Sequence, residues 1–182
     1  CAPQDSFASS YPIGGNRGTV KGSNAGCGVE TGEPTHAGSR ASSVWWTYTA
    51  PSSGLVTIDT FGSAFDTVLA VYTGNTVGAL TLVNSNDDTA PGSRSKVAFA
   101  ATGGQRYRIA VDGRNANTGA IKLNWKHAAS PANDNLADAW VVAGANGATG
   151  GSTNGATRET GEPMHRHRGF ASAWWSCTAA ST

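Results

Sequence analysis

Acidic residues recur in this sequence at a spacing that suits a site for a hard metal ion. The segment from Glu30 to His36 reads Glu-Thr-Gly-Glu-Pro-Thr-His, and it returns from Glu159 to His165 with Met in place of the second Thr. An aspartate lies upstream of each copy. Ca²⁺ is bound by oxygen atoms of carboxylates, carbonyls and water. The predicted calcium ligands are Asp5, Glu30 and Glu33 in the first copy and Asp134, Glu159 and Glu162 in the second.

The Thr-Gly pair between the two glutamates explains how they would meet. In a straight strand, residues i and i+3 face opposite sides, so Glu30 and Glu33 converge only where the backbone bends. Converged carboxylates repel each other, and a divalent cation relieves that repulsion. Without a metal, the same acids would pair with Arg17, Arg40 or solvent. The histidines expected to support the carboxylates without binding the ion are His36 and His165.

A second candidate oxygen site lies in the run Ser-Asn-Asp-Asp at 85–88. Asp87 and Asp88 are its possible metal ligands. Turns rich in Asp and Asn also form for local backbone reasons, so a turn without metal is the alternative. Asp66 and Asp112 border predicted strands, and we interpret them as turn or network acids.

The sequence lacks the common catalytic motifs. Neither Gly-x-Ser-x-Gly nor His-Glu-x-x-His is present. The repeated carboxylates could form the acid pair of a glycosidase, but a set duplicated at a fixed period fits a structural ion better. We therefore expect a protein without catalytic activity.

The acidic segments belong to a longer internal repeat. Residues 4–53 and 133–182 align without gaps at a shift of 129, and 19 of the 50 aligned positions are identical. Such self-similarity indicates a repeated structural unit. We predict a complete unit over residues 4–125, a linker over 126–132, and the first part of a second unit over 133–182. Residues 54–125 have no second match, so the second unit would be completed by further sequence or by another chain.

Short strands must position these acids. Strand-like runs occur at 17–21, 44–49, 55–60, 67–72, 80–83, 96–100, 106–111 and 121–125. Alternation places Val56 and Ile58 on one face of their strand, and it predicts that Tyr107, Ile109 and Val111 share the inner face of theirs. No long helical pattern interrupts these runs. The pattern predicts an all-β protein, an antiparallel β-sandwich. The spacing of the strands leaves a barrel open as the alternative, and the jelly-roll-like form follows from the resemblance given below.

Trp45 and Trp46 are neighbours on one predicted strand and form part of the repeat. Successive side chains of a strand point to opposite faces, so one Trp belongs in the core and the other on the outer face of the sheet. We expect the outer Trp to serve as structural cover rather than as a ligand platform.

The three cysteines do not follow the repeat. A disulfide between Cys1 and Cys27 is predicted for an exported protein, with a lipidated Cys1 as the alternative. Cys177 would stay free, or pair with a cysteine outside this sequence or in another chain.

Composition narrows the range of partners. Charged residues make up 14% of the chain and the formal net charge is +1, so we expect no basic patch and no nucleic-acid partner. No apolar run approaches the length of a membrane span.

Several segments occur in an order that is typical of one bacterial family. They are the acidic segments and the runs 44–46, 65–74, 85–88, 107–113 and 133–135. Together they resemble pre-peptidase C-terminal-type domains. The resemblance implies an extracellular jelly-roll-like sandwich, often repeated and often appended to secreted proteases. The similar collagen-binding domains of clostridial collagenases bind Ca²⁺ through an Asn-Asp segment at the domain entry and a later acidic pair. This implies Asn133 as a further ligand, where the first copy has Gln4.

These observations lead to one functional expectation and one alternative. We expect a non-catalytic, extracellular, calcium-binding repeat protein with a structural or adhesive role in a surface array or fibre, which self-associates through its incomplete second repeat. The alternative is an accessory module of a secreted protease or other hydrolase, which binds a collagen-like protein or a polysaccharide.

Overall fold

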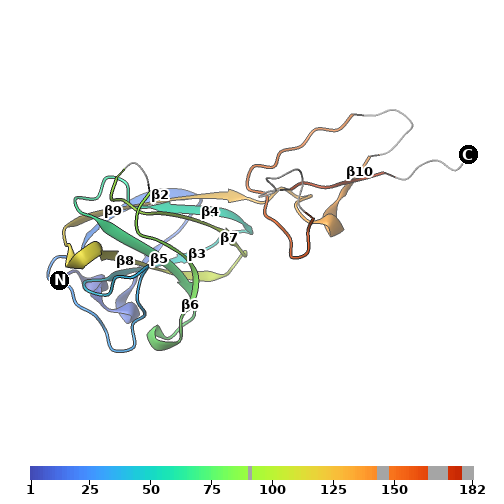
Figure 1. Ribbon diagram of the computed structural model, residues 1–182. Coiled ribbons are helices and arrows are strands. Elements are labelled where there is room, and N and C mark those ends of the chain that lie inside the picture. The colour runs from blue at the N-terminus through green and yellow to red at the C-terminus, as the bar shows by residue number, and fades with distance from the viewer. Residues whose placement is uncertain (90–91, 143–147, 164–171, 178–182) are drawn as a thin grey trace, which may run out of the picture.

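The computed structural model describes residues 1–89, 92–142, 148–163 and 172–177. The described residues up to Ala129 form a two-layered β-sandwich, and the described residues after it lie beyond one end of the sandwich (Figure 1). Helical structure in the described part of the chain is limited to 3-10 turns of three residues each. No helix among these residues is long and apolar enough to cross a membrane.

The sandwich consists of a five-stranded and a four-stranded sheet. Sheet A has the order β1 (Tyr11–Ile13), β3 (Val44–Thr49), β8 (Arg106–Gly113), β5 (Thr67–Thr73) and β6 (Thr81–Asn86). Sheet B has the order β2 (Arg17–Ser23), β9 (Ala120–Ala129), β4 (Gly54–Asp59) and β7 (Lys96–Ala101). Neighbouring strands run antiparallel, except that β1 pairs in parallel with β3. The predicted all-β sandwich is confirmed, with the short parallel strand β1 added at one edge.

The core between the sheets follows the alternation of the sequence. On β4, Val56 and Ile58 are fully buried, and on β8 the side chains of Tyr107, Ile109 and Val111 fill the same core. Apolar side chains on alternate positions of both sheets provide the hydrophobic driving force for this layer.

A second, smaller apolar cluster covers the outer face of sheet A. Trp46 points into the inter-sheet core, whereas Trp45 points outward, and both are fully buried. The entry segment, η1 (Pro3–Asp5) and η2 (Phe7–Ser9), contributes Phe7, whose ring lies 5.2 Å from that of Trp45. Tyr72 on β5 belongs to the same cluster. Trp45 is therefore covered by the protein's own residues.

Strand β9 is longer than the sequence pattern predicts. It continues to Ala129 and pairs with β4 as far as Gly54. Residues 126–129 of the predicted linker therefore belong to sheet B. His127 is buried among the core side chains because alternation continues through this segment.

The second unit repeats the edge pairing of the first. Its described residues contain η5 (Leu136–Asp138) and a parallel pair, β10 (Trp140–Val141) with β11 (Trp175–Ser176). Trp140 is opposite Trp175, just as Tyr11 is opposite Trp46 in the first unit. Both pairs are related by the shift of 129 residues.

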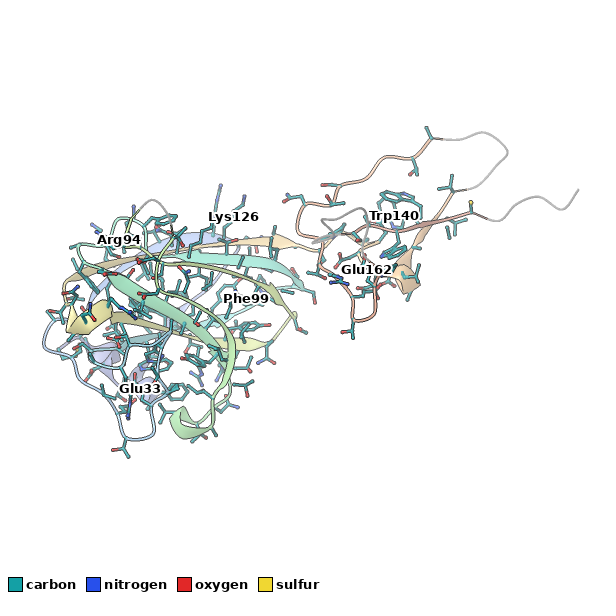
Figure 2. The ribbon with its side chains drawn as sticks, viewed as in Figure 1. Glu33, Arg94, Phe99, Lys126, Trp140 and Glu162 are labelled. Carbon is teal, nitrogen blue, oxygen red and sulfur yellow. A yellow bond between two sulfur atoms is a disulfide. The ribbon has the colours of Figure 1, made fainter. Side chains whose placement is uncertain are left out.

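The outer face of sheet B gathers basic residues. All four lysines of the chain point outward from this sheet together with Arg17, and all five side chains are exposed. We call this surface the cationic face; its members are Arg17, Lys21, Lys96, Lys122 and Lys126. Figure 2 shows Lys126 pointing away from the sandwich. The expectation of no basic patch was wrong, because net charge does not report how charges are distributed over the faces.

Candidate calcium site and entry motif

Carboxylates tie the entry segment to the loop that follows β2. Asp5 Oδ1 accepts a hydrogen bond from the Gly28 amide at 3.0 Å, and Glu30 Oε2 accepts one from the Phe7 amide at 2.5 Å. The chain bends at Gly32, which has a φ of +86°. The bend lies where the Thr-Gly pair predicted it, and the acids near it hold the entry segment by direct hydrogen bonds.

Glu33 is the buried centre of this loop (Figure 2). Its Oε1 accepts hydrogen bonds from Ser43 Oγ and from His36 Nε2, the latter at 2.9 Å. Its Oε2 accepts one from the Glu30 amide at 2.8 Å. His36 is fully buried, and its Nδ1 lies 2.8 Å from the Tyr72 hydroxyl. His36 thus connects the Glu33 carboxylate to the Tyr72 hydroxyl. Its supporting role beside a metal ion stays a prediction.

The surroundings of Glu33 favour its ionised form. Burial alone would raise the pKa of Glu33, but hydrogen bonds from His36, Ser43 and the Glu30 amide outweigh this effect, so the pKa is lowered. Burial raises the pKa of Tyr72, and the negative charge of Glu33 adds to this increase. Glu33 is therefore a charged anchor whose two oxygens already have protein donors.

The second copy has the same contacts at the shift of 129. The Leu136 amide donates to Glu159 Oε2 at 2.7 Å, as Phe7 does to Glu30. Asp134 Oδ1 accepts from the Thr157 amide at 2.7 Å. The Glu159 amide donates to Glu162 Oε2 at 3.0 Å. We call this shared arrangement of one Asp and two Glu side chains, together with the backbone amides they bind, the entry motif.

Asn133 begins the second copy of the entry segment. Asn133 is buried, and its Nδ2 donates to the Trp174 carbonyl at 2.9 Å, while the Trp174 amide donates to the Asn133 carbonyl at 2.8 Å. Asn133 thereby connects the entry segment to the Trp pair. His165 lies outside the described residues.

A calcium ion needs oxygen atoms that surround one point at about 2.3–2.6 Å. Among the described residues, two groups of three acidic, Cys or His side chains have ligand atoms within 4.8 Å of one another, and neither copy of the predicted acidic set is among them. The predicted ligands are held near each other, but their carboxylates face backbone amides. Calcium at the entry motif stays a prediction.

The first of the two groups is not a metal site. It consists of Asp5 with Cys1 and Cys27, and these two cysteines form a disulfide with a Cα–Cα distance of 4.6 Å. The disulfide fastens the chain start to the same loop that Asp5 and Glu30 hold. Cys177 is free and exposed.

The second group is an acidic cluster of Asp66, Asp87 and Asp88. Asp66 precedes β5 and the other two follow β6. These strands are antiparallel neighbours, with Leu69 opposite Asn86, so the start of one meets the end of the other. Asp87 and Asp88 were predicted as possible ligands, but Asp66 was interpreted as a turn acid. The sequence could have indicated Asp66 as a third ligand, because a hairpin between the two strand-like runs would bring it next to Asp87 and Asp88.

Two oxygens of the acidic cluster are buried without a donor. They are Asp66 Oδ1 and Asp87 Oδ1. Burial raises the pKa of Asp66, and repulsion from Asp88 and Asp87 raises it further, against the opposing effect of Arg114 and Arg94. Arg114 Nη1 lies 3.1 Å from Asp87 Oδ2, which offsets part of the charge. Carboxylate oxygens that lack donors and repel each other fit a hard cation.

Apolar residues of the second unit are exposed where their counterparts are buried. Trp175 is 37% exposed against 0% for Trp46, and Leu136 is 58% exposed against 7% for Phe7. In the first unit, Trp46 is covered in the core between the two sheets, and Phe7 is covered by Trp45 and by residues of β5 and β8. Self-association through this surface stays a prediction.

Known proteins resemble this chain in structure, and 14 solved chains match it. No protein family matches the sequence, and no curated protein is similar to it. The fold is similar to the pre-peptidase C-terminal domain of a collagenase from Bacillus anthracis, with 17% sequence identity and a TM-score of 0.43. The match covers 64% of this chain and 94% of that domain. The domain is of the same type that the sequence motifs resemble.

Proposed function

We propose that this chain is a non-catalytic, extracellular repeat protein that holds β-sandwich units in a fixed mutual orientation, with a structural or adhesive role. The observation that carries the proposal is the entry motif, which is built twice with the same donors and acceptors at a shift of 129 residues. Each copy anchors the start of a unit to its own loop. A repeat of this kind suits the alignment of consecutive units better than it suits catalysis.

The junction between the units supports a fixed orientation. The last strand of the first sandwich ends at Ala129, and Ser130 Oγ donates to the Gly155 carbonyl at 3.2 Å. Gly155 lies so close to the end of β9 that an added Cβ would be 2.2 Å from the Ala129 carbonyl oxygen. The neighbouring Ala156 is buried. The second unit is therefore in direct backbone contact with the first.

The remaining groups support the non-catalytic and extracellular parts of the proposal. His36 and His127 are buried, and the Glu33 carboxylate accepts three hydrogen bonds from within the protein. Groups that perform acid–base chemistry must reach the substrate. A disulfide joins Cys1 and Cys27, and such bonds persist in oxidising compartments.

Calcium is part of the proposal, and the geometry favours the acidic cluster over the entry motif. The test is thermal unfolding with Ca²⁺ against chelator. Saturation at 100-fold over the dissociation constant stabilises the folded state by about 2.7 kcal/mol. We expect the Asp87→Asn variant to lose this response. Without calcium, Asp66→Asn should be more stable than the wild type, because it removes a repelling charge.

Glu30→Gln is the matched control, since it removes one carboxylate from the entry motif and leaves the acidic cluster intact. If Glu30→Gln loses the response and Asp87→Asn keeps it, the ion binds at the entry motif instead. If the wild type melts at the same temperature in Ca²⁺ and in chelator, the calcium part of the proposal is wrong.

A further inference from the structure

The basic side chains of the cationic face are arranged in like-charged pairs. On the adjacent strands β2 and β9, Arg17 is directly opposite Lys126, and Lys21 is directly opposite Lys122. Like charges directly opposite each other destabilise a sheet. Among the described residues, the ion pairs within 4.0 Å are His36–Glu33 and Arg114–Asp87, so no member of the cationic face has a partner of that kind.

The charge of the chain is therefore unevenly distributed. Asp59 is the one carboxylate among the outward side chains of sheet B, where it is opposite Lys96 on β7 and Asn124 on β9. Asn124 Nδ2 donates to Asp59 Oδ1 at 2.6 Å. Five cations against one acid on a single face create a local positive potential, although the whole chain carries +1.

Between the cations the surface offers hydrogen-bonding groups. Thr19 and Asn124 lie between the two like-charged pairs, and Thr19 Oγ1 donates to Asn124 Oδ1 at 2.9 Å. Phe61, which is 41% exposed, lies just past the end of β4. At the opposite end the face meets a groove of about 580 Å³ between sheet B and residues 153–158. A long flexible chain has room to lie along this surface.

We propose that the cationic face binds an anionic polysaccharide, a sugar chain that carries carboxylate or sulfate groups. Charge complementarity selects a polyanion, and the interspersed hydroxyl and amide groups suit sugar hydroxyls. A nucleic acid is read by elements that enter a groove or by aromatic platforms that stack bases. The centre of the cationic face has neither, because its outward residues are basic, small or polar. This binding goes beyond the alignment of units.

The experiment measures binding of the full chain to polygalacturonate and to a heparin fragment at low ionic strength, with dextran as the neutral control. The test variant is Lys122→Gln/Lys126→Gln. The matched control is Arg40→Gln/Arg106→Gln, which removes the same charge from exposed positions outside the cationic face. We expect roughly tenfold weaker binding for the test variant and less than about twofold for the control, with binding weakened further by added salt.

Each of the following results would overturn the proposal: no binding of either polyanion by the wild type, an equal loss of affinity in both double variants, or binding of dextran as tight as that of polygalacturonate. Tighter binding to DNA or to vesicles containing anionic lipid than to either polysaccharide would also contradict it. Circular dichroism confirms that the exposed substitutions leave the fold intact. None of these results depends on calcium or on the orientation of the units, so the proposed function is tested separately.

Discussion

The contact between Gly155 and the end of β9 provides a direct test of the fixed junction. Gly155 has a φ of +79°, and an added Cβ would lie 2.2 Å from the Ala129 carbonyl oxygen and 2.6 Å from the Ala128 carbonyl oxygen. In Gly155→Ala the backbone must retreat by about 0.8 Å to restore a 3.0 Å contact. A retreat of that size would lengthen the 3.2 Å bond from Ser130 Oγ beyond hydrogen-bonding range.

Gly26, the counterpart of Gly155 in the first unit, allows the steric clash to be separated from the backbone strain. Gly26 has a φ of +72°, and an added Cβ there would meet no atom nearer than 3.7 Å. Both alanine variants carry the cost of a left-handed conformation, about 1–2 kcal/mol. Only Gly155→Ala adds overpacking, which costs about 1–3 kcal/mol. The difference between the two variants therefore reports the junction contact.

Hydrogen exchange of backbone amides measures this local opening. We expect Gly155→Ala to lower protection in residues 128–134 and 153–162 by about tenfold or more, since about 1.4 kcal/mol is a factor of ten. Gly26→Ala should lower protection around residues 24–30 and leave the junction unchanged. Equal protection of the junction in the wild type and in Gly155→Ala would refute the fixed contact.

Two further predictions concern the first unit. The pKa of Glu33 is lowered from 4.5 in the folded state, so its contribution to the free energy of unfolding is complete above pH 4.5 and is lost as the pH falls through the lowered value. Glu33→Gln should therefore cost about 1–3 kcal/mol at neutral pH and make the stability fall less steeply in acid. Urea unfolding at several pH values measures this, and parallel curves for the variant and the wild type would contradict it. The Cys1–Cys27 disulfide closes a loop across a separation of 26 residues. Cys1→Ser/Cys27→Ser should therefore lower the free energy of unfolding by about 3 kcal/mol, whereas the control Cys177→Ser should change it little. A similar loss in both variants would show that opening the loop is not the cause.

Much of the fold follows from local patterns. Alternation along β4 and β8 identifies the side chains that face the core, and adjacency on one strand places Trp45 and Trp46 on opposite faces. The end of β9 was misplaced because Lys126 and His127 resemble a polar linker. In the sheet they continue the alternation, with one side chain exposed and the other buried.

The candidate site was only partly accessible from the sequence. Residue type and spacing marked Glu30 and Glu33 as converging acids, but their donors are backbone amides and His36, whose positions depend on the fold. Asp66 joins Asp87 and Asp88 because two antiparallel strands bring their ends together. The spacing of acids along the sequence does not reveal which donors their carboxylate oxygens face in the folded protein.

The amino-acid sequence by itself determined the repeat of 129 residues, the alternating strands and the bend at Gly32, because each is encoded in neighbouring residues. The tertiary structure alone decided that Arg17 faces Lys126 and that Lys21 faces Lys122. These residues are about a hundred positions apart in the chain, and strand register brings them together. A nearly neutral sequence thus folds into a protein with one strongly positive face, because charge balance is a sum over the chain whereas binding depends on position.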